Sequence, residues 1–443
     1  MSLIQTLIFQ VKKTTQGESF GMDVREVPGG ILNLERRRSF HTSNIKVLVM
    51  GLGKVGLPIS CYFAGLGHTV YGYDVNEQLM ADLASGINPL RWEDGICLDS
   101  IKLVRSLGYI IDQIDFVYVI VPTPTDSSGT KLSAKYVIEA RDEIRSLKWR
   151  GPIAIGSTLD PRTISEVFTS SPMFYNPPLI RLGHVVNDMA VQHPLLIGWS
   201  YNNSDRTYLD RLHQLYGVHP EIAYSDPNYS AVLIGDYLSI ALTKLAINTT
   251  LSVKISWANE IAAVVRELGG SVSTVFEGLH ADPRIGADYN MPGWPACGPC
   301  LKRDMDIWTE FARTKHISEA SVTGDADTRH KFVTQVVNTV RSVSLPKVAI
   351  LGITYNPGAL DLTKSRGLAI AAALISEDID VKIYDPAGTW GGFSDILKEY
   401  PVVDSLNAAL ENSNVVVKAT DWPEFRNVDF GSRIVIDASG KKI

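Results

Sequence analysis

The sequence predicts an α/β protein with two doubly wound parallel-sheet domains joined by a long central helix. Buried-strand patterns alternate with helical patterns near both ends of the chain, starting at residues 45–50 and again at 347–352. Between them, residues 234–268 have helical periodicity with few breakers, which predicts one long helix. We therefore expect an N-terminal extension of unassigned role (1–44), a Rossmann-like domain (45–230), a central helical segment (231–330) and a second Rossmann-like domain (331–443).

The composition narrows the class of protein. The chain has 443 residues and a formal net charge of −6, so it lacks the basic footprint of a nucleic-acid-binding protein. No apolar run reaches the roughly 20 residues of a membrane-spanning helix, and residues 1–10 lack the features of a secretory signal. The cysteines, Cys61, Cys97, Cys297 and Cys300, are too few for a disulfide framework. This cysteine usage predicts a reducing, cytoplasmic setting.

A cofactor-binding pattern follows the first strand. The motif Gly51-Leu-Gly-Lys-Val-Gly56 links a buried strand to a helix, and a second strand then ends in Asp74. In this order the first glycine permits the tight turn, the second lets a pyrophosphate approach the backbone, and the third packs helix on strand. Asp74 would bind ribose hydroxyls and repel a 2′-phosphate, so we expect NAD rather than NADP, with a glycine-rich turn without ligand as the alternative. The expected contacts are Gly51, Leu52, Gly53, Lys54, Val55, Gly56 and Asp74.

Two more strands of this sheet are expected at residues 114–121 and 152–158. The carboxyl ends of such strands line the cofactor crevice of a doubly wound sheet. Candidate cofactor contacts at these ends are Val121, Pro122, Thr123 and Thr158. Strand-end caps are the alternative interpretation of the two threonines.

The second domain repeats the opening pattern loosely. Gly352 and Asp385 follow its first two strands, but no glycine triplet accompanies them. Strands are expected at residues 347–352, 381–385, 415–420 and 434–437. A cleft between the two domains is then the expected ligand site.

The segment Pro295-Ala-Cys-Gly-Pro-Cys-Leu-Lys-Arg-Asp304 carries the candidate chemistry. A thiol reacts as the thiolate, and nearby cations or a helix N-terminus lower its pKa. The cations Lys302 and Arg303 lie between Cys300 and Asp304, and the carboxylate could handle protons. A thioredoxin-type redox pair with Cys297 and two ordinary loop cysteines are the alternatives.

Lys244 and Asn248 lie four residues apart on the expected central helix, so they share one face. A lysine and an asparagine on an apolar-flanked face suit the stabilisation of an alkoxide. From spacing alone, a solvated helix face is an equally good interpretation.

Taken together, these motifs resemble those of the UDP-glucose/GDP-mannose dehydrogenase family from about residue 45 to the end of the chain. The Asp282-Pro-Arg-Ile-Gly286 element is similar to the UDP-glucose branch, and Pro299 stands where N-acetylhexosamine branches carry a histidine. The matching segments are Val49–Pro58, Val121–Thr125, Ser157–Thr158, Lys244–Asn248, Lys254–Glu260, Asp282–Gly286, Gly298–Asp304, Tyr384–Pro386 and Thr420–Phe425.

The resemblance implies a reaction and a set of roles. Family members oxidise the C6 alcohol of a nucleotide sugar to a carboxylate with two NAD, through a cysteine thiohemiacetal and thioester. Cys300 would be the nucleophile, Lys244 and Asn248 would stabilise the oxyanion, and Asp304 would act in proton transfer; Thr158 joins them as a catalytic candidate. The expected substrate contacts are Leu179, Ile180, Gly183, Lys244, Asn248, Arg284, Tyr289 and Asp361.

The resemblance further implies a homodimer or higher homo-oligomer, because Arg284 would reach the substrate from the neighbouring subunit. It implies no metal, nucleic-acid or membrane partner. The cellular role would be polysaccharide biosynthesis in the cytoplasm.

Several family positions differ in this chain. The family segment Asn-Pro-Glu-Phe-Leu-x-Glu-Gly reads Asn176–Gly183 here, with Pro178 and Leu182 in place of both glutamates. Asn356 stands where the family has a phosphate-binding lysine, and Thr363 where it has a nearby arginine. A second family arginine falls near Ser439, and Cys297 replaces a glycine before the cysteine turn. These changes predict a divergent substrate.

Two further functions stay open, together with one regulatory hypothesis. A two-electron alcohol dehydrogenase resembling the 3-hydroxyacid and 6-phosphogluconate enzymes would need no cysteine. A non-catalytic NAD-binding paralogue would need neither cysteine nor lysine. A reversible disulfide between Cys297 and Cys300 is the regulatory hypothesis, since the two lie three residues apart across a Gly-Pro turn.

Overall fold

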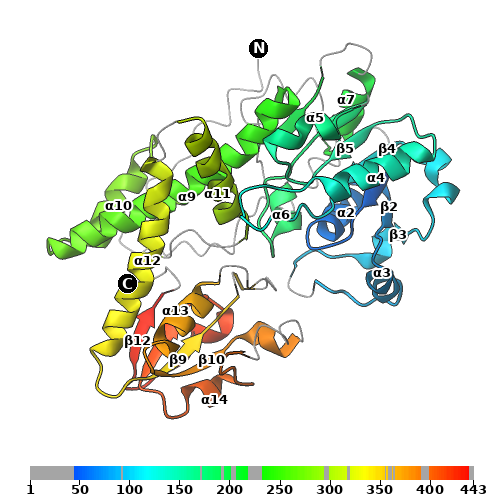
Figure 1. Ribbon diagram of the computed structural model, residues 1–443. Helices are drawn as coiled ribbons and strands as arrows, with labels where there is room; N and C mark the ends of the chain where they lie inside the picture. Colours follow the sequence, from blue (N-terminus) through cyan, green and yellow to red (C-terminus); the bar gives the residue numbers. More distant parts are fainter. Residues whose placement is uncertain are drawn as a thin grey trace, which may run out of the picture.

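The structure is a computed structural model with two α/β domains and a helical segment between them (Figure 1). The N-terminal extension up to residue 43 lies outside the described residues, and so do Cys297, Asp361, Thr363 and Ser439. The described residues are 44–90, 93–169, 172–190, 194–200, 206–217, 232–293, 299–316, 320–354, 356–357, 362, 365–390 and 399–438.

The first domain is built on an eight-stranded sheet with the order β3-β2-β1-β4-β5-β6-β7-β8. All neighbouring strands are parallel except β6 and β7, which meet in an antiparallel pair at Tyr175 and Gly198. The expected parallel sheet is therefore mixed at this one junction. The strands are β1 Lys46–Met50, β2 Thr69–Tyr73, β3 Ile101–Leu103, β4 Phe116–Val119, β5 Ile153–Ile155, β6 Met173–Tyr175, β7 Leu195–Gly198 and β8 Val232–Gly235.

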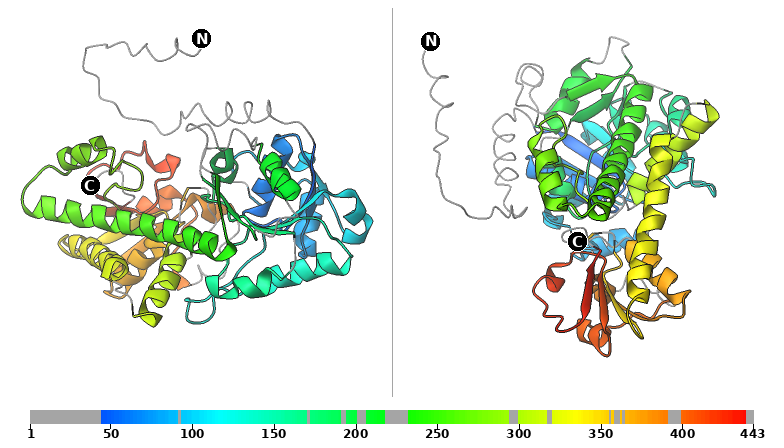
Figure 2. Two further views of the ribbon diagram at one scale, coloured as in Figure 1. Left: turned by 90° about the horizontal axis from the view of Figure 1, so that it is seen from above. Right: turned by 90° about the vertical axis from the view of Figure 1, so that its left-hand side faces the viewer.

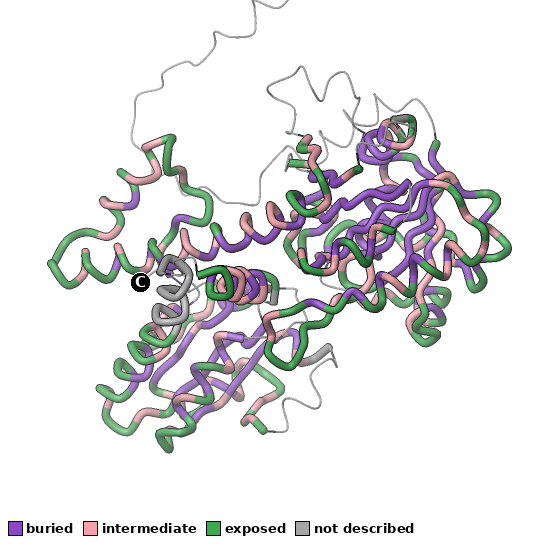
Figure 3. The backbone as a smooth tube through the Cα atoms, turned by 45° about the horizontal axis from the view of Figure 1, so that its top comes forward, coloured by how far each residue is buried: buried purple, intermediate pink, exposed green. Residues whose placement is uncertain are grey.

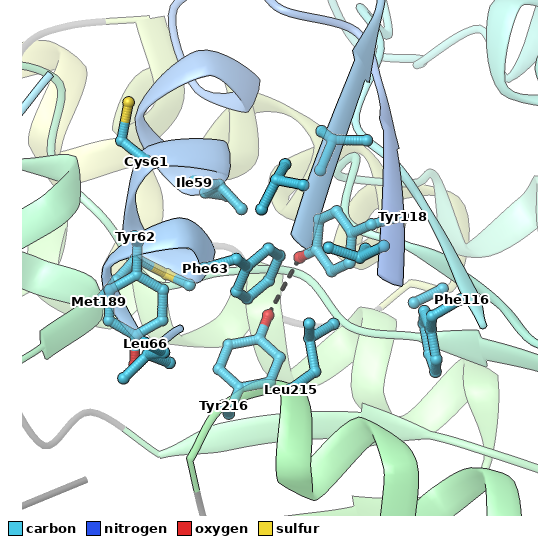
Figure 4. Packing of buried hydrophobic residues seen from close by; sticks show 14 of the residues in the cluster. Ile59, Cys61, Tyr62, Phe63, Leu66, Phe116, Tyr118, Met189, Leu215 and Tyr216 are labelled. Atoms are coloured by element: carbon cyan, nitrogen blue, oxygen red, sulfur yellow. Dashed lines mark hydrogen bonds between the residues drawn. The ribbon is translucent and has the colours of Figure 1, made fainter. Parts of the chain in front are cut away.

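Helices cover both faces of this sheet, because successive strand residues point to opposite sides. In β1, Val47 and Val49 pack with the core under α2, α6 and α7, whereas Leu48 and Met50 pack with the core under α4 and α5. Figure 4 shows the first of these cores, where the Tyr118 hydroxyl meets that of Tyr216 at 3.2 Å. The helices are α2 Gly56–Gly65, α3 Glu77–Ala84, α4 Lys135–Ser146, α5 Ile164–Val167, α6 Val185–Ala190 and α7 Arg206–Leu215, with 3₁₀ turns at Leu98–Ser100, Leu107–Tyr109, Ile111–Gln113 and Pro161–Thr163.

The central segment is dominated by α9, a helix of 31 residues from Tyr237 to Glu267. The expected helix was too long at its start, because Ile234 belongs to β8. Asp236 ends the strand and caps the helix, since its side chain accepts from the Ser239 N–H at 2.9 Å. The first sheet thus continues past the expected boundary at residue 230. The other central helices are α10 Val272–Ala281, α11 Pro299–Thr314 and α12 Ala320–Arg341.

The second domain contains a four-stranded parallel sheet with the order β10-β9-β11-β12. The long helix α12 leads into it from the central segment, as the right-hand view of Figure 2 shows. Figure 3 shows that buried residues follow the strands of both sheets. The elements are β9 Lys347–Leu351, α13 Arg366–Ile375, β10 Asp380–Tyr384, α14 Leu406–Leu410, β11 Val415–Lys418 and β12 Ile434–Asp437, with 3₁₀ turns at Pro386–Trp390 and Pro423–Phe425.

Candidate active site

The glycine turn between β1 and α2 has the geometry that a dinucleotide site requires. Gly51 has φ +96, and a Cβ there would lie 2.3 Å from the carbonyl oxygen of Ile120. A Cβ on Gly56 would lie 1.9 Å from the carbonyl oxygen of Gly51, so only glycine lets the helix approach the strand this closely. Gly53 has open space where its Cβ would be, which leaves the turn accessible from that side.

Asp74 follows β2 directly and lies beside this turn. Its carboxylate accepts hydrogen bonds from the Leu52 N–H at 2.7 Å and the Asn76 N–H at 2.9 Å. The side chain remains partly exposed. The turn and the acid therefore fit a dinucleotide, with backbone N–H groups for the pyrophosphate and a carboxylate for the ribose. Of the other predicted contacts in the turn, Lys54 is exposed and Val55 immediately precedes α2.

The predicted contacts beyond β4 and β5 lie at one edge of the sheet. Val121, Thr123 and Thr158 are partly buried, and Pro122 is exposed. Ser157 joins the two strand ends, because its hydroxyl accepts from the Val121 N–H at 2.9 Å and donates to the Val121 carbonyl at 2.7 Å. Ser157 was not among the predicted site residues. Its position after a buried strand, directly before the predicted contact Thr158, could have suggested that it links the two strand ends.

Lys244 and Asn248 share one buried face of α9, as their spacing predicted. The Lys244 ammonium donates to the carbonyl oxygen of Pro178 at 2.8 Å. Burial lowers the pKa of Lys244, although the charges of Asp304 and Cys300 oppose this shift. The Asn248 amide donates to the Asp304 carboxylate at 2.6 Å. The spacing predicted only that the two side chains share a face, and their burial in the structure excludes the alternative of a solvated face.

Helix α11 brings the cysteine and the acid to this face. Cys300 is the second residue of α11 and is exposed, so its thiol lies in the first turn of the helix. Asp304, one turn later, is fully buried. Its carboxylate is paired with the Arg303 guanidinium at 2.7 Å. Cys300, Lys244, Asn248 and Asp304 therefore meet where α11 crosses α9.

The two cations beside the cysteine behave differently. Lys302 pairs with Asp306 at 2.6 Å, one turn further along the helix. Burial works against the charge of Arg303, but Asp304 and Cys300 outweigh it and raise the pKa of the guanidinium. The expectation that both cations act on the thiol is therefore replaced by a single cation, Arg303, in the polar cluster.

Apolar packing fixes α11 in place. Leu245, the neighbour of Lys244, is fully buried against Ile307 of α11 and Leu132. On the far side, the Arg162 guanidinium lies 4.8 Å from the centre of the Phe311 ring. Fully burying a leucine or isoleucine side chain contributes about 1.5–3 kcal/mol, so these contacts help to hold the helix in place.

The segment from Asn176 to Gly183 passes along the same site. Leu179 and Ile180 pack their side chains on the two core clusters of the first domain, so a ligand would meet mainly their backbone. Leu182, which replaces a family glutamate, also packs on a core. Gly183 has φ +91, and a Cβ there would lie 3.7 Å from the Pro357 carbonyl oxygen of the second domain. The segment therefore reaches the boundary between the domains.

The predicted contacts Arg284 and Tyr289 follow α10, outside the helices that carry the cluster. Arg284 is exposed and pairs with its neighbour Asp282 at 2.6 Å. Tyr289 has φ +57, an uncommon conformation for an aromatic residue. Burial raises its pKa, and the charges of Arg181 and Asp188 also act on its hydroxyl, which places it beside the 176–183 segment. Asp361 lies outside the described residues.

Sequence reasoning missed Tyr175 at the end of β6. It is fully buried, and its hydroxyl accepts from the Leu159 N–H at 3.0 Å. Burial raises its pKa, and the charges of Asp304 and Arg303 act on it. No local pattern marks a tyrosine at a strand end as part of a site formed by two helices.

Comparison with known proteins matches the chain to one family in three parts. Residues 45–218 match the NAD binding domain of the UDP-glucose/GDP-mannose dehydrogenase family, residues 239–328 its central domain and residues 349–440 its UDP binding domain. UDP-glucose 6-dehydrogenase AglM of Haloferax volcanii is 27% identical, over 90% of this chain and 97% of its own length. UDP-glucose 6-dehydrogenase TuaD of Bacillus subtilis is 24% identical, over 87% of this chain and 85% of its own length.

Solved structures give the same picture of the fold. A UDP-glucose dehydrogenase from Pyrobaculum islandicum superposes with a TM-score of 0.77 at 24% identity, covering 89% of this chain and 94% of its own. A UDP-D-ManNAc dehydrogenase from Pyrococcus horikoshii has a TM-score of 0.68 at 21% identity, over 87% and 91% of the two chains. At these identities the likeness concerns the fold. Among the described residues, no helix has the length and apolar character needed to span a membrane.

Proposed function

Because the chain belongs to the UDP-glucose/GDP-mannose dehydrogenase family, we propose that it oxidises the C6 alcohol of a nucleotide sugar to a carboxylate through a covalent adduct on Cys300. The observation that carries this proposal is the meeting of Cys300, Lys244, Asn248 and Asp304 where α11 crosses α9. Bound NAD would accept one hydride in each of two oxidations. Gly51, Gly53 and Asp74 would hold it.

The residues divide the work of the two oxidations. The Lys244 ammonium and the Asn248 amide would stabilise the alkoxide that forms when the C6 hydroxyl loses its proton. After loss of the first hydride, the Cys300 thiolate would add to the aldehyde and form a thiohemiacetal. Loss of the second hydride gives a thioester, and water then cleaves the carbon–sulfur bond to release the carboxylate and the thiol. Each sugar therefore consumes two NAD and one water.

Asp304 supports this chemistry from a fixed position. Its carboxylate is paired with Arg303 and accepts from Asn248, so the asparagine amide is held in one orientation. Its charge also raises the pKa of Lys244 against the effect of burial, which favours the protonated lysine that an oxyanion requires. We propose that Asp304 exchanges protons with the substrate through water rather than by direct contact.

The replaced glutamate position predicts a slow last step. Pro178 provides a carbonyl oxygen to Lys244 but has no carboxylate side chain to activate water. A missing general base typically costs about 10² to 10⁴ in rate. We therefore expect thioester hydrolysis to limit turnover and the adduct on Cys300 to accumulate. UDP-glucose should be a poor substrate, because Asn356 and Thr363 stand where the family carries two cations.

A screen of nucleotide sugars for NADH release tests the proposal. Two NADH per sugar support the four-electron reaction, one NADH supports the simple alcohol dehydrogenase, and none with any sugar supports a non-catalytic paralogue. Cys300→Ala should stop the reaction after at most the first oxidation. Cys97→Ala, which removes another exposed cysteine, is the matched control and should still carry out both oxidations. Intact mass during turnover measures the adduct, and its absence in a burst-free reaction would contradict the expected slow hydrolysis.

We also propose that the active enzyme is a homodimer or higher homo-oligomer. The exposed position of Arg284 supports this, since its side chain is 86% exposed in the single chain. Sedimentation gives the oligomeric state. Mixing Arg284→Ala protein with Cys300→Ala protein tests the shared site, because a mixed dimer would regain one complete site and a share of the activity.

A further inference from the structure

Glu93 is a buried acid outside the site described above. It follows α3, and only 6% of its surface is exposed. Its own N–H donates to the Leu90 carbonyl at 3.0 Å, which closes a turn. Neither the cofactor turn nor the cluster at Cys300 uses its carboxylate, so its role requires a separate account.

Both carboxylate oxygens of Glu93 face the chain that continues the substrate-side segment. Oε2 accepts from the Gly183 N–H at 2.8 Å, and Oε1 accepts from the Val185 N–H at 2.5 Å. The Val186 N–H approaches Oε1 at 3.4 Å. The carboxylate of Glu93 therefore connects Gly183, a predicted substrate contact, with Val185, the first residue of α6.

The packing around these bonds holds the two segments against each other. Gly95 has φ +81, and a Cβ there would lie 3.0 Å from the nearer methyl carbon of Val186. Two residues later the Cys97 N–H donates to the Cys61 thiol of α2 at 3.2 Å. The Glu93 segment is thus fastened to α2 at one end and to α6 at the other.

The segment that Glu93 holds has further anchors along its length. Asn176 donates to the Leu196 carbonyl at 2.8 Å, and Pro178 accepts from Lys244. Arg181 pairs with Asp188 at 2.6 Å. These anchors fix the start and the middle of the segment. The bond from Glu93 fixes its end, where Gly183 lies beside the second domain.

We infer that Glu93 is a positioning residue for the nucleotide-sugar side of the site: its ionised carboxylate sets the place of Gly183 and thereby the shape of the segment from Asn176. Both oxygens must accept for this, because Gly183 and Val185 are bound by different oxygens. The identity of the ligand rests on the proposed function, whereas the clamp itself rests on these contacts.

The charge of Glu93 works against the stability of the fold. Burial raises its pKa to about 7, although the backbone N–H groups lower it in part. The folded protein thus holds this proton more tightly than an unfolded chain with a pKa of 4.5, so the stabilising contribution is present below pH 4.5 and lost as pH rises through about 7. The ionised form serves the geometry of the segment at a cost in stability.

Protonation turns one Glu93 oxygen into a hydroxyl and removes the charge of the other, so the hydrogen bonds from Gly183 and Val185 both lose their charged acceptor. We therefore expect affinity for the nucleotide sugar to fall as pH drops through about 7. Among the described residues, the other charged or titratable groups on the elements packed against Glu93 are Asp94 on its own segment, Cys61 on α2, and Arg181, His184 and Asp188 near the start of α6.

Glu93→Gln tests the inference, since it keeps one acceptor oxygen and places an amide N–H₂ against the Gly183 N–H. Asp94→Asn is the matched control, because it removes the exposed neighbouring charge and leaves both hydrogen bonds of Glu93 in place. The probe is UDP-glucose, titrated by calorimetry at pH 8 and pH 6 without NAD. The Kd of the Glu93→Gln protein should rise roughly tenfold at pH 8, as expected for one lost charge-assisted hydrogen bond, while its Kd for NAD stays unchanged.

Two readouts separate positioning from a purely structural role. The wild type and the Asp94→Asn protein should bind UDP-glucose more weakly at pH 6 than at pH 8, whereas the Glu93→Gln protein should show no such change. The urea midpoint of the wild type minus that of Glu93→Gln should increase from pH 8 to pH 6, because the folded wild type gains the Glu93 proton and the glutamine does not titrate; a purely structural role would give the same difference at both pH values. Unchanged affinity and an unchanged pH response in Glu93→Gln would overturn the inference.

If UDP-glucose binds none of these proteins, the ligand class of the proposed function fails and the clamp is still tested. Hydrogen exchange of the amides of residues 183–190 then decides. Faster exchange in Glu93→Gln than in Asp94→Asn supports the clamp. Equal exchange in both overturns it.

Discussion

The two α/β domains contain the same backbone turn after their first strands. Gly51 and Gly352 have φ values of +96 and +95. Each donates its N–H at 2.8 Å to the carbonyl that ends the neighbouring strand. A Cβ on Gly56 would lie 1.9 Å from the Gly51 carbonyl oxygen, and one on Gly367 would lie 2.3 Å from that of Gly352. In both domains a glycine thus lets the first helix pack closely on the turn.

The turns differ two residues further on. Gly53 leaves open space in the first domain, whereas Thr354 in the second is fully buried. The Thr354 hydroxyl donates to Asp385 at 3.0 Å and accepts from the Trp422 indole at 3.2 Å. Asp385 is only 2% exposed, while Asp74 is partly exposed. One turn therefore offers its backbone and acid to a ligand, and the other is closed by its own side chains. The fold supplies the turn, and a single side chain decides its use.

The largest expected effect comes from opening the second turn. Thr354→Gly removes two buried hydrogen bonds and adds the conformational freedom of glycine, which together should cost about 2–3 kcal/mol of stability. Urea unfolding of the second domain measures this loss, and calorimetry should show an unchanged Kd for NAD. A fall in NAD affinity similar to the loss of stability would show that the two turns are not independent.

Closing the first turn is the reverse experiment. Gly53→Thr places a side chain in the open space where a pyrophosphate would approach. Overpacking of this kind typically costs about 1–3 kcal/mol, so the Kd for NAD should rise roughly ten- to hundredfold. Gly65→Ala in α2, another glycine with open space, is the control and should leave the Kd unchanged. Tight NAD binding by Gly53→Thr would place the pyrophosphate elsewhere.

The two acids sharpen the comparison further. Asp74→Asn should lower the preference for NAD over NADP by roughly tenfold, because one ribose acceptor and the repulsion of a 2′-phosphate are lost. Asp385→Asn should leave this preference unchanged and reduce the stability of the second domain instead. Calorimetric titration of both proteins with NAD and NADP measures the ratio. Equal affinities in the wild type would remove the role of Asp74 in cofactor choice.

The smallest effect concerns the pH dependence of the closed turn. Burial raises the pKa of Asp385, although hydrogen bonds from Thr354, Ile353 and Ala387 lower it in part. A raised folded-state pKa stabilises the protonated form, so this contribution is present below the unfolded value of 3.8 and is lost as pH rises through the folded pKa. The urea midpoint of the wild type minus that of Asp385→Asn should therefore decrease from pH 3.5 to pH 7. An increase over this range would contradict the sign.

Local patterns predicted the elements whose geometry is itself local. The glycine turn, Asp74 at a strand end and the shared face of Lys244 and Asn248 follow from spacing alone. Strand β8 was missed because helical periodicity extended into Ile234, although Gly235 and the capping side chain of Asp236 both signalled a break there. The ion pair between Lys302 and Asp306 could have been read from its spacing of four residues.

The rest depends on packing between distant segments. Asn248 and Asp304 are 56 residues apart, and no pattern in either helix predicts that they meet. The burial of Asp385 required knowing that Thr354 and Trp422 would lie over it. The hydrogen bonds of Glu93 connect it to residues that lie between 90 and 93 positions later in the sequence. Such contacts follow from the complete fold.

The length of α9 has a mechanical consequence. At about 1.5 Å per residue, its 31 residues span roughly 46 Å. Lys244 and Asn248 lie near the end that grows from the first sheet, and Leu245 fastens α11 to the same stretch. The second domain is connected to the rest of the chain through α12. A rotation of the second domain would therefore leave the reacting groups on α9 and α11 in the same positions relative to each other. Raising the solvent viscosity should then lower the rates of substrate binding and product release and leave the rates of the chemical steps unchanged.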